Sequence, residues 1–194
     1  MNIQGLILNP EAKQAAFLLA EKTFERYRNN PGHYRNTANS HLVGHLGEFA
    51  AFIWLRDNGF EPEAAFSDPT KNRDPDIFTN VGRIEVKTWK AEFWDDWGRC
   101  VSVNQLASVK RKADLIIWCV ADEIESDTPK IEFKGWSEVS DIENLEPKMT
   151  GKESRQIYNY QFDEASLNSI DSLITREINE QGRNIAGGNS SDNG

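Results

Sequence analysis

The segment from Asp74 to Thr88 has the sequence DPDIFTNVGRIEVKT and decides the expected fold. It predicts a β-hairpin with a short strand over 75–79, a turn at 80–82 and a returning strand over 83–88. The turn is short enough to hold the two strands side by side. The chemistry of this region therefore depends on which side chains the hairpin brings together.

Alternation along the returning strand separates an apolar set of side chains from a charged set. Ile84 and Val86 are expected to face a core, whereas Glu85 and Lys87 face the other way. The hairpin places Asp76 beside Glu85. Two carboxylates and one ammonium group on one patch can bind a divalent cation and activate a water molecule beside it.

A third carboxylate lies upstream, in the apolar segment GHLGEFAA at 44–51. Burial of an unpaired Glu48 would be costly, so its position favours a cation partner. The alternative is that Glu48 lies on an exposed stripe of its helix beside His41, His45 and Arg56. The pattern of the helix alone leaves both interpretations open.

Periodicity and the order of elements predict one α/β domain over 1–181 with a mixed sheet. Helices are expected over 10–28, 41–58, 105–113 and 164–181, capped by Asn9, Ser40, Asn104 and Asp163. Strands are expected near 60–66, 75–79, 83–89, 100–103, 115–120 and 130–136. The continuous apolar run at 115–120 predicts a strand buried on both faces. The strand at 130–136 is expected nearer an edge, and the tail 182–194 is expected to be disordered.

Length and composition indicate a globular protein, since 194 residues suffice for a real core. No stretch is long enough for a membrane span, and the N-terminus lacks a signal-peptide pattern, so a cytoplasmic location is expected. Cys100 and Cys119 lack a CxxC spacing and are expected to be small buried side chains. The four aromatic residues Trp89, Phe93, Trp94 and Trp97 are expected mostly in a core or a dimer contact.

The formal net charge of −9 is unevenly distributed. Residues 122–194 hold 16 acidic and 7 basic side chains, whereas residues 1–121 hold 15 of each. Since phosphate contacts depend on local charge, the basic stretch 83–112 keeps a nucleic-acid partner open. Candidate phosphate contacts are Lys71, Arg73, Lys90, Lys110, Arg111 and Lys112. For 110–112 the alternative is a solvated helix end that the helix dipole favours.

Three pieces of the sequence together resemble the PD-(D/E)xK nuclease superfamily, which has the restriction-endonuclease-like fold. They are Gly47-Glu48, Pro75-Asp76 and Glu85-Val86-Lys87, and the resemblance covers about residues 40–136. It implies a central mixed β-sheet flanked by helices. It also implies a magnesium-dependent endonuclease that hydrolyses phosphodiester bonds of DNA.

Catalytic roles are expected for Asp76, Glu85, Lys87 and Glu48. Asp76 and Glu85 would bind Mg²⁺, which prefers hard oxygen ligands and for which Mn²⁺ is expected to substitute. Lys87 would assist the attacking water, and Glu48 would hold a second metal ion or an outer-shell water. The resemblance adds the backbone carbonyl of Val86 as a ligand.

Two more polar side chains are candidates for the site. Asp74 shares a strand face with Asp76 and competes with it as a metal ligand. The resemblance suggests that Gln105, at the start of the helix after the motif strands, faces the site, although an exposed first-turn position is the alternative.

Cutting both strands of a duplex needs two active sites, so a homodimer is expected. Two other functions remain open. The first is a nucleic-acid-binding or assembly protein that retains the nuclease fold without cutting. The second is a small α/β domain that mediates protein contacts through its acidic face at 122–194.

Overall fold

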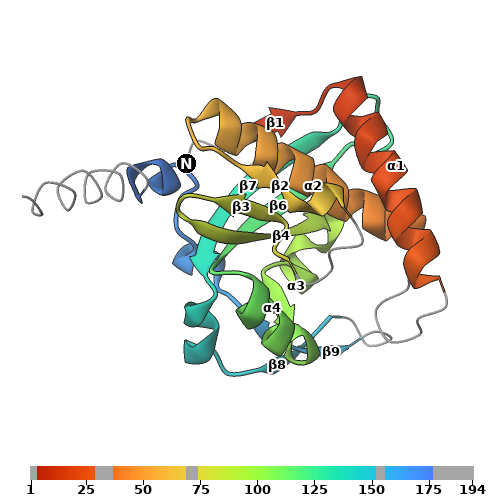
Figure 1. Cartoon of the computed structure of the whole chain (residues 1–194). Helices are drawn as coiled ribbons and strands as arrows, with labels where there is room; N and C mark the ends of the chain where they lie inside the picture. Colours follow the sequence, from red (N-terminus) through yellow and green to blue (C-terminus); the bar gives the residue numbers. More distant parts are fainter. Residues whose placement is uncertain (1–3, 29–36, 69–73, 152–155, 177–194) are drawn as a thin grey trace, which may run out of the picture.

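The computed structural model describes residues 4–28, 37–68, 74–151 and 156–176, whose arrangement is drawn in Figure 1. Its helices are α1 (Pro10–Tyr27), α2 (Ala38–Asp57), α3 (Trp94–Trp97) and α4 (Leu106–Lys112). Its strands are β1 (Gln4–Ile7), β2 (Glu63–Ala64), β3 (Ile77–Thr79), β4 (Gly82–Lys90), β5 (Cys100–Ser102), β6 (Leu115–Asp122), β7 (Lys130–Glu138), β8 (Lys148–Thr150) and β9 (Ile157–Gln161). The protein is thus a mixed α/β fold, as the order of elements predicts.

Six of these strands form a twisted mixed sheet in the order β1-β7-β6-β4-β3-β2. β4 and β6 run parallel, and the other neighbouring strands run antiparallel. The parallel pair requires a long crossover, which contains α3, β5 and α4. Three further strands form a small antiparallel sheet in the order β5-β9-β8.

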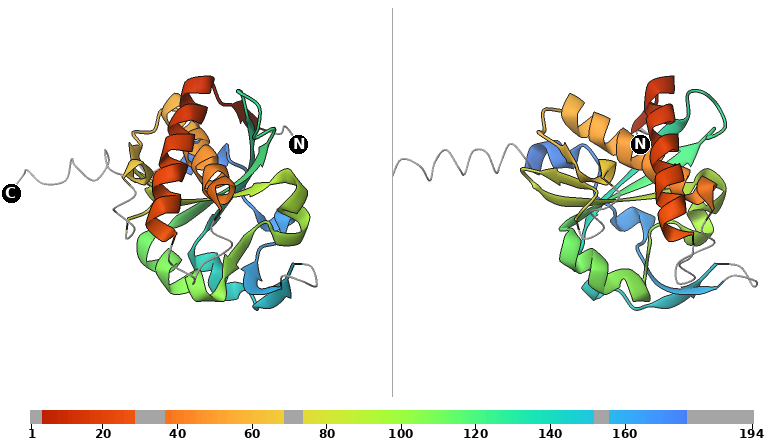
Figure 2. Two further views of the ribbon diagram at one scale, coloured as in Figure 1. Left: turned by 90° about the vertical axis from the view of Figure 1, so that its right-hand side faces the viewer. Right: turned by 45° about the vertical axis from the view of Figure 1, so that its right-hand side comes forward.

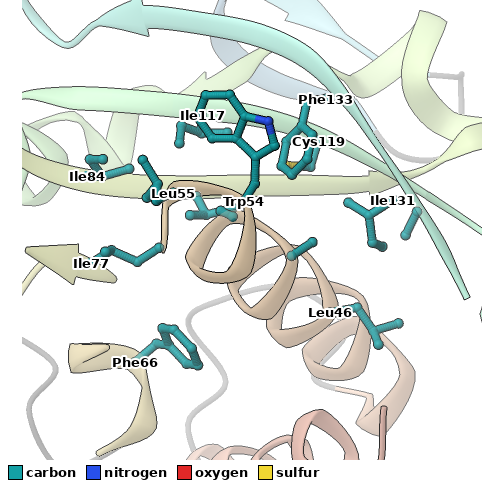
Figure 3. Close-up of a cluster of buried hydrophobic side chains, with 14 of the residues drawn as sticks. Leu46, Trp54, Leu55, Phe66, Ile77, Ile84, Ile117, Cys119, Ile131 and Phe133 are labelled. Carbon is teal, nitrogen blue, oxygen red and sulfur yellow. The ribbon is translucent and has the colours of Figure 1, made fainter. Parts of the chain in front are cut away.

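The central strand β6 is buried on both faces, as its apolar run predicts. Its Leu115, Ile117 and Cys119 enter one core with side chains from α1 and α2. Figure 3 shows Ile117 and Cys119 in this cluster beside Trp54 of α2. Its alternate residues, Ile116 and Trp118 among them, enter a second core with α4, β5 and β9. The six-stranded sheet therefore lies between α1 and α2 on one side and α4 with the small sheet on the other (Figure 2).

Capping residues explain where the two long helices begin. Asn9 accepts a hydrogen bond from the Ala12 N–H at 2.8 Å, and Pro10 occupies the first helical position. Helix α2 begins at Ala38, three residues before the predicted start. Thr37 is its N-cap, and Ser40 completes a capping box with Thr37 instead of capping the helix itself.

Long-range strand pairing accounts for the main errors in the predicted elements. The strand predicted at 130–136 is β7, which is nearer an edge than β6, as expected, but is covered by the edge strand β1. The pattern did not predict β1, β8 or β9. The predicted helix 164–181 is wrong in its first half, because the backbone of Asn168 pairs with Trp136 on β7 and the chain turns helical only at 172–176. Its remainder and the tail 182–194 lie outside the described residues.

Smaller corrections concern the strand predicted at 60–66 and the start of α4. The strand predicted at 60–66 is reduced to β2, followed by a 3₁₀ turn at Ala65–Ser67. Asn104 lies inside another 3₁₀ turn, and no side-chain cap precedes α4. The strand predicted at 100–103 is confirmed as β5, which belongs to the small sheet.

Both cysteines are free and buried, as expected. Burial raises the pKa of the Cys100 thiol to about 11 and that of Cys119 further. Trp94 is buried, and Trp89 stacks on Trp118 with ring centroids 5.9 Å apart. Among the helices of the described ranges, none combines the length and the apolar character that a bilayer crossing needs.

Candidate active site

The hairpin of β3 and β4 brings Asp76 beside Glu85. Thr79 pairs with Gly82 across a two-residue turn, and Gly82 has a positive φ of 134° that side chains rarely tolerate. The register continues past β3, since the Asp76 N–H donates to the Ile84 carbonyl at 3.0 Å. The Asp76 Oδ2 atom in turn accepts the Val86 N–H at 2.7 Å. The sequence predicted this adjacency correctly.

Glu85 is a buried carboxylate held between two ammonium groups. The residue is 3% exposed. Lys87 Nζ lies 2.6 Å from Oε1, and Lys112 Nζ contacts Oε2. Burial alone would raise the pKa of Glu85, but the charges of Lys87 and Lys112 outweigh it and lower the pKa. Glu85 is therefore ionised at neutral pH.

The pKa of Asp76 is shifted in the opposite direction from that of Glu85. Burial and the neighbouring charge of Glu85 raise the pKa of Asp76 to about 8, against the opposing effects of Lys112 and the Val86 N–H. The charge of Glu48 contributes to the same rise. A cation bound between these carboxylates would favour their ionised forms.

Glu48 approaches the site from α2, on the other face of the sheet. Its side chain is 13% exposed, and its Oε2 lies 2.6 Å from Nδ1 of His45. The His45 Nε2 shares a hydrogen bond with the Thr23 hydroxyl. Burial would lower the pKa of His45, but the charges of Glu48 and Asp76 outweigh it and raise the pKa. The exposed-stripe alternative for Glu48 is wrong, although His45 is indeed its neighbour.

Gly47 allows α2 to lie close enough to β4 for Glu48 to reach this region. A Cβ atom at Gly47 would lie 1.8 Å from Oγ1 of Thr88 and 2.9 Å from its Cβ. The Thr88 hydroxyl is buried and finds no hydrogen-bond partner within the described residues. At this point α2 and β4 are therefore in contact through the backbone of Gly47 and the side chain of Thr88.

Lys112 belongs to the candidate site through a contact that the sequence did not predict. It was expected to contact phosphate, yet the structure places its ammonium group on Glu85. Arg83 fixes the end of α4, because its guanidinium binds Asp114 and donates to the Arg111 carbonyl at 2.8 Å. The parallel register of β4 and β6 pairs Glu85 with Ile116, so the end of α4 lies near Glu85. The contact of Lys112 with Glu85 could have been predicted only if the parallel pairing of β4 with β6 had been recognised.

The remaining candidate residues that the structure describes are exposed or half-buried. Lys110 pairs with Glu143 on the surface at 2.5 Å, and Arg111 is exposed. Lys90 ends β4, Gln105 is half-buried just before α4, and Asp74 is half-buried two residues before Asp76. Lys71 and Arg73 lie outside the described residues.

The donor set fits a hard divalent cation that keeps part of its water shell. In the described ranges, no three His, Cys, Asp or Glu side chains already form a group that could hold a metal ion. Mg²⁺, however, commonly binds through one or two carboxylates with waters and substrate phosphate. Asp76 and Glu85 supply two carboxylates. The Val86 carbonyl lies on the same side of β4 as its N–H, which faces Asp76.

No family model, no curated protein and no solved structure matches this chain.

Proposed function

We propose that this protein is a magnesium-dependent deoxyribonuclease with a restriction-endonuclease-like core. The observation that carries the proposal is the buried Glu85, bound to Lys87 on its own strand and placed beside Asp76 by the hairpin. Paired acidic groups with a lysine at hydrogen-bond distance are suited to metal-assisted phosphodiester hydrolysis. The mixed sheet flanked by helices is compatible with such a core.

Each residue of the site has a separate task in this proposal. Asp76, Glu85 and the Val86 carbonyl would hold Mg²⁺, which supplies charge for the phosphate and acidifies a water molecule. Lys87 positions the attacking water and stabilises negative charge that develops on the phosphate. Glu48 accepts a hydrogen bond from a water in the outer shell or holds a second ion. His45 orients the Glu48 carboxylate through their contact.

DNA is the proposed partner, and a homodimer is the proposed assembly for cutting both strands. Arg111 and Lys110 at the end of α4, together with Lys90 at the end of β4, would contact the DNA backbone. These contacts are electrostatic, so binding is expected to weaken as salt rises.

One observation also favours a second function, in which the fold binds nucleic acid without cutting it. Both carboxylate oxygens of Glu85 already contact ammonium groups, so the cluster is charge-compensated without a metal ion. A protein that had lost catalysis could retain such a cluster for stability.

A cleavage assay separates the two functions. Supercoiled plasmid, linear duplex and branched DNA are incubated with the protein in Mg²⁺, in Mn²⁺ and in EDTA. The nuclease proposal predicts cutting of at least one substrate with either metal and none in EDTA. A mobility shift without cutting of any substrate would instead support the binding protein.

A further inference from the structure

Glu85 uses its two oxygens differently. Oε1 forms a hydrogen bond and ion pair with Lys87 at 2.6 Å. Oε2 forms an ion pair with the ammonium group of Lys112. Each oxygen of Glu85 therefore has its own lysine partner.

Lys112 also lies where a cation would neutralise the whole site. Its ammonium group interacts electrostatically with Asp76, Glu85 and Glu48 together. Its side chain is 17% exposed, and it comes from the end of α4 on the face opposite α2. Lys112 therefore adds a second positive charge, beside that of Lys87, to a group of acidic side chains that a divalent metal ion could also neutralise.

We propose that Lys112 is a resident counter-ion that holds the cation position in front of Glu85 Oε2, and that a divalent cation binds by displacing it. This inference rests on the proposed nuclease function. Lys87 stays on Oε1, beside the place of the attacking water. The flexible stem of Lys112 lets its ammonium group move while α4 stays anchored through Arg83 and Asp114.

The displacement couples metal binding to substrate binding. Before the metal ion binds, Lys112 neutralises the carboxylates and lowers their attraction for any cation. After displacement, its ammonium group is free to bind a phosphate oxygen of the substrate. Removal of its charge should therefore strengthen metal binding in the absence of DNA and weaken metal-dependent DNA binding.

Calorimetric titration with Mn²⁺ measures the first effect on the full chain. Lys112→Gln is expected to bind Mn²⁺ about tenfold or more tightly than the wild type, since a buried competing charge is removed. Lys112→Arg keeps the charge and should retain the weak affinity. The matched control is Lys130→Gln, which breaks a surface pair with Glu123 and should leave the affinity unchanged.

The outcomes distinguish this inference from the proposed function. If Mn²⁺ binds to Lys112→Gln but not to the wild type, Lys112 competes so strongly that it blocks the cation position, which supports the proposal. Equal affinities, with binding abolished by Asp76→Asn, would overturn the role of Lys112 and leave the metal site standing. Failure of both proteins to bind Mn²⁺ would overturn both.

Acetylation of the wild-type protein, quantified by mass spectrometry, avoids any dependence on a variant that fails to fold. Lys112 should be protected without metal and become labelled as Mn²⁺ saturates the site, while labelling of Lys130 stays constant. Continued protection of Lys112 at saturating Mn²⁺ would overturn the displacement.

Discussion

At the scale of residues, two neighbouring carboxylates differ because their partners differ. Glu85 contacts two ammonium groups, which lower its pKa. Asp76 accepts a backbone N–H, and burial with the charge of Glu85 raises its pKa. Sites that separate the pKa values of adjacent carboxyl groups are common where acid–base or metal chemistry occurs.

This contrast predicts a pH-dependent stability difference in metal-free protein. Because the pKa of Asp76 rises from 3.8 to about 8 on folding, the native state binds the proton more tightly than the unfolded state does. The stability that Asp76 contributes is thus present at low pH and is lost as pH rises toward about 8. Asn does not ionise. The melting temperature of Asp76→Asn should therefore increase relative to that of the wild type as pH rises from 3.8 to about 8.

Thermal melts of both proteins in EDTA across that window check the prediction. A difference in melting temperature that grows with pH agrees with it. A difference that stays constant with pH would show that Asp76 is not protonated in the native state.

The proximity of Asp76, Glu85 and Lys87 could be predicted from the sequence because strand alternation and a tight turn are local properties. Glu48 required one more step, namely recognition of a carboxylate within an apolar helix. Lys112 could not be assigned from its own neighbourhood, since a basic helix end has the same pattern whether it is solvated or buried. Its place depends on the parallel pairing of β4 with β6, which is a long-range property.

At the scale of elements, the contact between α2 and β4 depends on one glycine. Gly47→Ala would drive a methyl group into Thr88, so the helix must shift away from the strand. We expect a loss of about 1–3 kcal/mol in the free energy of unfolding, as for overpacked cores. The shift would also draw Glu48 away from the carboxylates of the hairpin.

Gly44 on the same helix provides the matched control. A Cβ atom there meets nothing within 4 Å, so Gly44→Ala should stabilise the protein by roughly 0.5–1 kcal/mol. Addition of Thr88→Ala to Gly47→Ala should recover part of the loss, because the hydroxyl contact is removed. Chemical denaturation measures all three variants. Equal effects of the two glycine substitutions would contradict the close approach.

Elements with strong local signals were predicted well, and elements defined by their partners were not. Asn9-Pro10 marks the start of α1, and the apolar run of β6 marks a buried strand. The short strands β1, β8 and β9 carry little pattern of their own and exist through pairing. The same reason explains the failure at 164–171, where pairing of Asn168 with Trp136 overrides helical periodicity.

At the scale of the whole molecule, the candidate site lies where the two layers meet. Helix α2 brings Glu48 from one face of the sheet, and α4 brings Lys112 from the other. The hairpin supplies Asp76, Glu85 and Lys87 between them. The alternation of elements predicted a mixed α/β fold, but the small sheet and its contribution to the second core were not predicted.

The acidic excess of the chain and the candidate site lie in different parts of the sequence. The acidic excess belongs to residues 122–194, whereas the site is built from residues 48–112, where charges are balanced. The net charge of −9 is therefore carried by residues outside the segment that builds the candidate site.

The most direct test of the proposed nuclease is the ratio of plasmid-cleavage rates in Mg²⁺ for the wild type and Lys87→Ala, with Lys130→Ala as the charge-matched surface control. We predict a metal-dependent rate for the wild type, a similar rate for Lys130→Ala, and a rate lower by about 100-fold or more for Lys87→Ala. Circular dichroism would establish that all three are folded. Equal rates for Lys87→Ala and the wild type, or no metal-dependent cutting by the wild type, would contradict the account.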